Sequence, residues 1–187
     1  MKIIKIIFLL CIVILTNSCK VECPCFNKNL LTWMPYEVDD ELLYVNQQND
    51  TLFFTVKSKI LSEEYKEKKR FEEECFSKAE FEISDDLSTS GYDYTIYNYK
   101  DGATIDFKFS ILIHNNVYSS GGNSFLDIDC CLDTMTINNK LYQETITIER
   151  DTINFSDEIW KVIVANNYGI VKFYDKKTGY EWTLVEE

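Results

Sequence analysis

The chain has 187 residues and carries 31 acidic against 19 basic side chains, which gives a formal net charge of −12 at pH 7. This acidic surplus argues against binding to nucleic acid and against electrostatic attraction to anionic lipid. Aromatic residues make up 14% of the chain and only two residues are proline, which indicates a folded body and excludes a disordered one.

The first eighteen residues have the pattern of a signal peptide. Lys2 and Lys5 precede residues 6–15, in which the only polar side chain is Cys11. An apolar run of about ten residues fits a cleaved signal, whereas a membrane-spanning helix needs about 20. We therefore expect residues 1–18 to be removed.

The dipeptide Ser18-Cys19 resembles the lipobox of bacterial lipoproteins. In that family the signal is removed before the cysteine, whose thiol receives a diacylglycerol group. The resemblance implies that Cys19 is lipidated, that the bilayer is a partner of the chain and that the chain is located in the cell envelope, at the outer membrane. The alternative is ordinary secretory cleavage near Ser18, which would leave Cys19 to pair or to stay free.

Removal of the signal leaves residues 19–187, with 17 basic and 31 acidic side chains and a charge of 17 − 31 = −14. A chain of this length fits one domain. We expect a lipidated cysteine and short tether over residues 19–31 and a single folded domain over residues 32–187.

Five cysteines remain after cleavage and lipidation, and an exported chain favours disulfides between them. Cys75 and Cys130 each fall on the apolar side of an alternating segment, so we predict that these two form a disulfide. Pairing of Cys23 or Cys25 with Cys131 is a second possibility. We expect no metal site, because the two thiols of the CPC motif are too close in sequence for a usual zinc site.

Most of the remaining sequence predicts β-strands, at residues 51–61, 79–84, 92–99 and 103–114. The last of these alternates apolar and polar residues, from Ile105 to Ile113 on one face, as a half-buried strand does. The charged segment 62–76 has no continuous apolar stripe at helical spacing. We predict two strand ends that meet at a charged tip near residues 66–70, with a short helix as the alternative.

Three turn signals predict hairpins. They are Asp101-Gly102, Asn138-Asn139 and the triplet that ends in Gly179, all residues that tolerate positive φ. No crossover helices are available for a parallel sheet. The predicted fold class is all-β: a single antiparallel meander that forms a curved sheet, roll or sandwich.

The C-terminal third resembles the ending of small uncharacterised lipoproteins of the Bacteroidetes type. That ending combines an alanine, a glycine-containing turn and a final W-x-L strand, carried here by Ala165, Gly169, Phe173, Asp175, Gly179, Trp182 and Leu184. The resemblance implies a β-rich domain anchored in the envelope and names no activity. From the residues themselves, Gly169 relieves a turn or bulge, while Trp182 and Leu184 bury one face of the last strand.

No arrangement in the sequence favours catalysis. The sole histidine, His114, stands at a strand end beside two asparagines, and no nucleophile elbow or phosphate loop is present. Asp127 and Asp129 share one face of a strand and could join a calcium site, but we interpret them as solvated surface charge. We expect no catalytic residue, no metal and no cofactor.

The candidate binding surface is aromatic. Tyr97 and Tyr99 share the side of a strand opposite Ile96, and Tyr118 begins an expected mobile loop at residues 118–123. Aromatic side chains on the wet face of a sheet can contact a glycan or a protein, unless a second layer covers them. The predicted function is a non-catalytic binding or adaptor module for an envelope protein or glycan; the alternative is a carrier of an apolar ligand within a curved sheet.

Overall fold

The structure, a computed structural model, describes residues 23–68, 73–86, 90–99, 102–113, 116–120, 126–127, 132–149, 159–176 and 178–185. The elements are, in chain order, the 3-10 helix η1 (Lys28–Trp33) and the strands β1 (Glu41–Val45), β2 (Thr51–Lys68), β3 (Glu73–Ser84), β4 (Gly91–Tyr99), β5 (Gly102–Ile113), β6 (Asn116–Ser120), β7 (Leu126–Asp127), β8 (Asp133–Ile137), β9 (Lys140–Glu149), β10 (Ile159–Ala165), β11 (Gly169–Asp175) and β12 (Glu181–Val185). The all-β prediction is confirmed. Among the described residues, no helix is long and apolar enough to cross a membrane.

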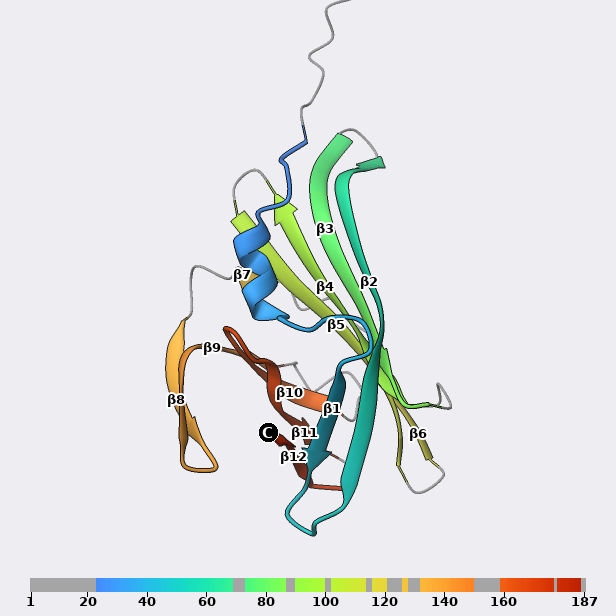
Figure 1. Cartoon of the computed structure of the whole chain (residues 1–187), viewed down its shortest axis with the longest axis vertical. Helices are drawn as coiled ribbons and strands as arrows, with labels where there is room; N and C mark the ends of the chain where they lie inside the picture. Colours follow the sequence, from blue (N-terminus) through green and yellow to red (C-terminus); the bar gives the residue numbers. More distant parts are fainter. Residues whose placement is uncertain are drawn as a thin grey trace, which may run out of the picture.

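The strands form one antiparallel sheet in the order β6-β5-β4-β3-β2-β1-β12-β11-β10-β9-β8, and β7 pairs with β5. Two meanders, one from β1 to β6 and the other from β8 to β12, join where the first strand pairs with the last. The register there places Leu43 opposite Val185 and Val45 opposite Thr183. Figure 1 shows the resulting curved sheet, with η1 lying against one side of it. The predicted curved meander is confirmed.

The local turns form as the sequence predicts. Asn138 and Asn139 have φ of 49° and 67° between β8 and β9, and Gly179 has φ of 70° between β11 and β12. Tyr99 pairs with Gly102, which closes the β4–β5 hairpin. The described parts of the charged segment, residues 62–68 and 73–76, belong to two long strands, and Lys68 at the end of β2 pairs with Glu73 at the start of β3. The helical alternative is wrong for these described residues.

The main hydrophobic core lies on the side of the sheet that carries η1, called here the inner face. Trp33, Met34 and Tyr36, at and after the end of η1, pack there with the buried side chains of the sheet, among them Tyr44, Phe54, Tyr94, Phe173 and Trp182. Burial of this many large side chains drives the sheet to curve around η1.

A smaller cluster lies on the opposite, outer face of the second meander. Along β10, Val162 and Val164 belong to the inner core, whereas Ile163 and Ala165 belong to the outer cluster. Successive strand residues point to opposite faces, so one strand supplies both cores. The other buried members of the outer cluster are Ile137, Tyr142 and Val171.

Residues 23–31, which belong to the expected short tether, pack on the folded body. Phe26 is only 5% exposed. Asn98 Nδ2 donates to the carbonyl oxygen of Cys25 at 2.8 Å, and Asn167 N donates to that of Thr32 at 2.6 Å. This segment therefore crosses the inner face and is held by both meanders.

The segment that crosses the inner face also provides the disulfide partner of Cys75. Cys75 is bonded to Cys23, with 4.9 Å between their Cα atoms, so the predicted pairing of Cys75 with Cys130 is wrong. Cys75 does share the parity of Ala79 on β3, as predicted, but its partner comes from the N-terminal segment that packs on this face. Cys130 lies outside the described residues, and Cys25 is an exposed free thiol.

Candidate functional site

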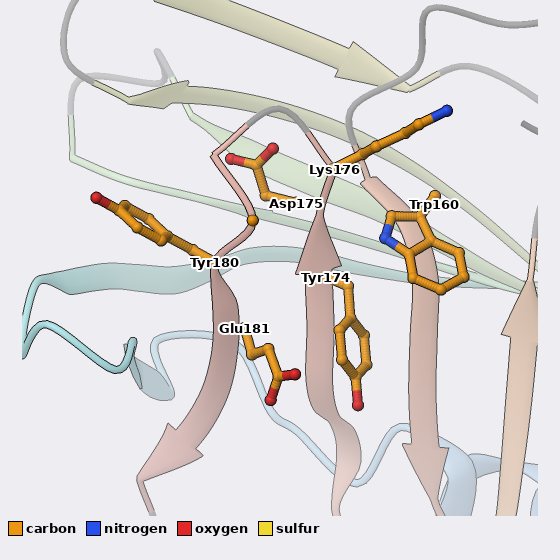
Figure 2. Close-up of a pocket in the computed structure, with 7 residues that line it drawn as sticks. Trp160, Tyr174, Asp175, Lys176, Tyr180 and Glu181 are labelled. Carbon is orange, nitrogen blue, oxygen red and sulfur yellow. The ribbon is translucent and has the colours of Figure 1, made fainter.

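A pocket of about 460 Å³ opens at the β11–β12 turn. It is lined by Trp160, Tyr174, Asp175, Lys176, Gly179, Tyr180 and Glu181. In Figure 2, Trp160, Tyr174 and Glu181 come from three neighbouring strands and lie close together, while Tyr180 points away from them. The pocket thus combines an aromatic wall with charged groups.

A β-bulge produces the aromatic wall. Ile159 pairs with Asp175 and Lys161 pairs with Tyr174, so Trp160 is an extra residue with no partner position on β11. A bulge re-aims the side chain of its extra residue. The indole ring lies 5.9 Å from the Tyr174 ring, at an interplanar angle of 53°, so the two rings form one continuous surface.

Two lysines lie over the aromatic rings. Lys172 Nζ is 4.8 Å from the centre of the Tyr174 ring, and Lys161 Nζ is 5.6 Å from it. Each lysine also pairs with a glutamate: Lys172 with Glu181 at 2.5 Å and Lys161 with Glu149 at 2.6 Å. The Tyr174 ring of the pocket wall therefore lies beside two lysines, each of which is paired with a glutamate.

The pKa of Lys172 is raised above its ordinary value. Burial by itself lowers the pKa, but the hydrogen bonds to Glu181 and Tyr174 and their favourable charge interactions raise it by more. The ammonium group consequently stays charged throughout the physiological range, and it can hold a polar or anionic group of a partner while Glu181 accepts from a donor.

Asp175 shapes the pocket and is not a free carboxylate. It is 2% exposed, and Thr178 donates to it through both its backbone N, at 3.2 Å, and its hydroxyl, at 2.5 Å. Its own backbone N donates to the carbonyl oxygen of Tyr180. This network, with Gly179 at positive φ, fixes the turn at the pocket.

Part of the predicted tyrosine surface is assembled on the outer face of β3 and β4. The rings of Tyr97 and Tyr99 stack with centres 6.1 Å apart, and the Phe76 ring contacts both at 5.4 and 5.3 Å. Phe76 is 3% exposed, whereas both tyrosines are half-buried. These three residues are called the tyrosine cluster below.

The strand pairing places the backbone of Tyr118 away from the tyrosine cluster. It belongs to β6, which starts at Asn116, so the expected loop at 118–123 begins as a strand. Tyr118 pairs with Ile111, whereas Tyr97 pairs with Thr104 near the other end of β5. Seven residues of strand separate these two levels, or roughly 23 Å.

Several predicted residues lie outside the described part of the chain. They are the signal peptide at residues 1–18, the lipidation residue Cys19, the histidine His114 and Asp129 of the carboxylate pair. Asp127 is in β7, paired with Thr104. Within the described ranges, no group of three or more metal-binding side chains is present.

Sequence reasoning missed the Trp160–Tyr174 pair. Fourteen positions separate the two residues, and only the bulge in β10 places the indole next to the tyrosine. The available signal was a lysine next to Trp160 and another two positions before Tyr174, on consecutive strands, which ordinary core packing also produces. No protein-family model, curated protein or solved structure matches the chain.

Proposed function

We propose that this chain is a lipoprotein of the cell envelope, anchored at the outer membrane through acylated Cys19, and that it works as a non-catalytic binding or adaptor module. The envelope and anchor assignments rest on the signal-like N-terminus and the Ser18-Cys19 pair. The partner is an envelope protein or glycan, which contacts the pocket at Trp160 and Tyr174.

The aromatic wall beside paired charges is the observation that supports a binding role. Large aromatic side chains give much contact area for little loss of conformational entropy, and they dominate binding energy in many interfaces. Lys172 and Glu181 flank the rings and supply a donor and an acceptor. Such a surface suits a polar partner with flat or apolar faces, whether a sugar or a peptide.

The packing of the inner face favours an adaptor over a carrier of an apolar ligand. A carrier needs space between the sheet and its cover. In the described residues that cover is made by Trp33, Met34 and Tyr36, which are at most 8% exposed and pack directly on the sheet. The core side chains thus occupy the place where such a ligand would sit.

A site-specific crosslink tests the binding role. A photoreactive amino acid replaces Trp160 in one variant and Leu141 in another, since Leu141 is an exposed apolar residue, 58% exposed, on β9. Native envelopes are irradiated, and adducts are identified by mass spectrometry; a glycan array probes the sugar partner separately. We expect an adduct or a retained glycan that depends on position 160 and is lost in Tyr174→Ala.

Equal labelling at both positions, or neither adduct nor glycan, would contradict the proposal. The anchor is tested by itself, through incorporation of a labelled lipid precursor into the expressed protein. Incorporation should stop in a Cys19→Ala variant.

A further inference from the structure

The disulfide fixes the N-terminal segment at one end of the sheet. Cys75 stands near the start of β3 and pairs with Lys66, two residues before β2 ends at Lys68. Cys23 is therefore bonded to the tip of the long β2–β3 hairpin, which lies far from the β1–β2 turn in Figure 1.

The distance from this tip to the lipid anchor is short. Cys19 is the acylation site of the proposed function, on which this inference rests, and it is joined to Cys23 by four Cα-to-Cα steps. Fully extended, they span about 14 Å. With the 4.9 Å between the Cα atoms of Cys23 and Cys75 added, Cys75 must therefore stay within about 19 Å of Cys19 and of the bilayer surface to which it is attached.

The pocket lies at the other end of the sheet. Fifteen residues of β2 separate Lys66 from Thr51, or roughly 50 Å along the strand. Thr51 is opposite Val45, which is opposite Thr183 on β12, and Glu181 of the pocket follows at the same end. The tether is too short for the sheet to stand on this end, with the β2–β3 end held away from the bilayer, while Cys23 stays bonded to Cys75.

Aromatic rings occupy the end that the anchor holds near lipid. The tyrosine cluster is level with the disulfide, because Ser77, two residues after Cys75, pairs with Asn98, between Tyr97 and Tyr99. Tyrosine side chains favour the membrane–water interface, where the ring is buried and the hydroxyl stays wet. A body with a charge near −14 gains no attraction from anionic lipid, so the anchor and these rings must provide the contact.

We infer that the β2–β3 end of the sheet, with Phe76, Tyr97 and Tyr99, faces the lipid surface, and that the Trp160–Tyr174 pocket faces away from it. The short covalent path from Cys19 through the Cys23–Cys75 disulfide keeps the β2–β3 end near the lipid, and the tyrosine cluster makes the contact there. The pocket is thereby presented to a partner that lies off the membrane.

Fluorescence quenching at the headgroup level tests this orientation. The acylated full chain is inserted into phosphatidylcholine vesicles, with or without a nitroxide on the lipid headgroup, and bound protein is isolated by flotation. Tyr97→Trp reports on the near end, and Tyr174→Trp is the matched control at the far end. The added emission of each variant is its difference from the unsubstituted chain in the same vesicles.

We expect the nitroxide to quench the added emission of Tyr97→Trp and to leave that of Tyr174→Trp unchanged. Tyr99→Trp repeats the near-end measurement if Tyr97→Trp does not fold. Quenching at Tyr174→Trp, alone or together with Tyr97→Trp, or quenching at neither end, in a floated chain would overturn the orientation and leave the anchor intact. A chain that does not float would overturn the anchor, and with it both the proposed function and the orientation.

Discussion

Tyr36 lies directly over Gly169. A Cβ atom at position 169 would come within 2.7–2.8 Å of three atoms of the Tyr36 side chain, and Gly169 has φ of +72°. The Tyr36 hydroxyl donates to the carbonyl oxygen of Tyr168. A residue that follows η1 thus closes the β10–β11 turn, and it ties the N-terminal segment to the C-terminal meander.

Gly169→Ala should destabilise the protein by about 3 kcal/mol, because the left-handed conformation costs a non-glycine residue roughly 1–2 kcal/mol and overpacking adds about 1–3 kcal/mol. The Tyr36 ring is 8% exposed and belongs to the core, so it has little room to move. Urea unfolding followed by tryptophan fluorescence measures the loss.

Gly179→Ala is the matched control for that substitution. Gly179 has nearly the same φ, +70°, but nothing lies within 4 Å of an added Cβ. Its substitution should cost only the backbone strain, roughly 1–2 kcal/mol. Equal losses for the two variants would show that contact with Tyr36 does not constrain position 169.

The parts of the fold that sequence predicts are local ones. Asn138-Asn139 and Gly179 specify their hairpins through φ preferences of one or two residues, and alternation over 103–105 reports which side of β5 is buried. The sequence does not predict the pairing of β1 with β12, because any two apolar strands of matching length have the same alternation of apolar and polar residues.

The same reasoning explains the disulfide and the pocket. The alternation along β3 predicts on which face of the sheet Cys75 lies. It does not predict which of the other cysteines packs against that face. Cys23 reaches it only because the N-terminal segment packs on the sheet as a layer. Trp160 likewise meets Tyr174 through a bulge, and a period-two pattern assumes that bulges are absent.

Tyr44→Phe should cost about 1–3 kcal/mol, because it removes a buried hydroxyl that has two partners. The Tyr44 hydroxyl donates to the carbonyl oxygen of Ile170 at 2.9 Å and lies 3.1 Å from the Tyr92 hydroxyl. The substitution removes the donor to the buried Ile170 carbonyl oxygen and one contact of the buried Tyr92 hydroxyl. The free energy of unfolding in urea measures the effect.

Tyr94→Phe serves as the comparison. Tyr94 is also 0% exposed, but its hydroxyl has no hydrogen-bond partner among the residues that the structure describes. Removing an unsatisfied buried hydroxyl should leave stability unchanged or increase it. A Tyr94→Phe variant less stable than Tyr44→Phe would contradict this account of the core hydrogen bonds.

Stability should fall steeply as the pH rises above 10. Burial raises the pKa of Tyr36, Tyr44, Tyr92 and Tyr94 well above the model-compound value of 10.0. Below pH 10 these hydroxyls are protonated in both states. Above it the unfolded chain releases protons that the folded chain retains, so each tyrosine weakens folding by about 1.4 kcal/mol per pH unit.

Urea unfolding on both sides of pH 10 measures that slope, and tyrosinate absorbance reports when the phenols ionise. The four ionisations should coincide with unfolding, and Tyr94→Phe should lower the slope by about one quarter. Ionisation of the four phenols in a chain that remains folded would refute the burial-shifted pKa values.

Loss of the Cys23–Cys75 disulfide should cost about 4 kcal/mol, since a bond that closes a loop of this size restricts the unfolded chain by about that amount. The two cysteines are 52 residues apart, and Cys23→Ser/Cys75→Ser removes the bond without leaving an unpaired thiol. Cys25→Ser is the control, because Cys25 is an exposed free thiol one residue beyond Pro24. Unfolding in urea without reductant should separate the two variants clearly. If Cys25→Ser lost as much stability as the double variant, Cys25 and not Cys23 would be the partner of Cys75.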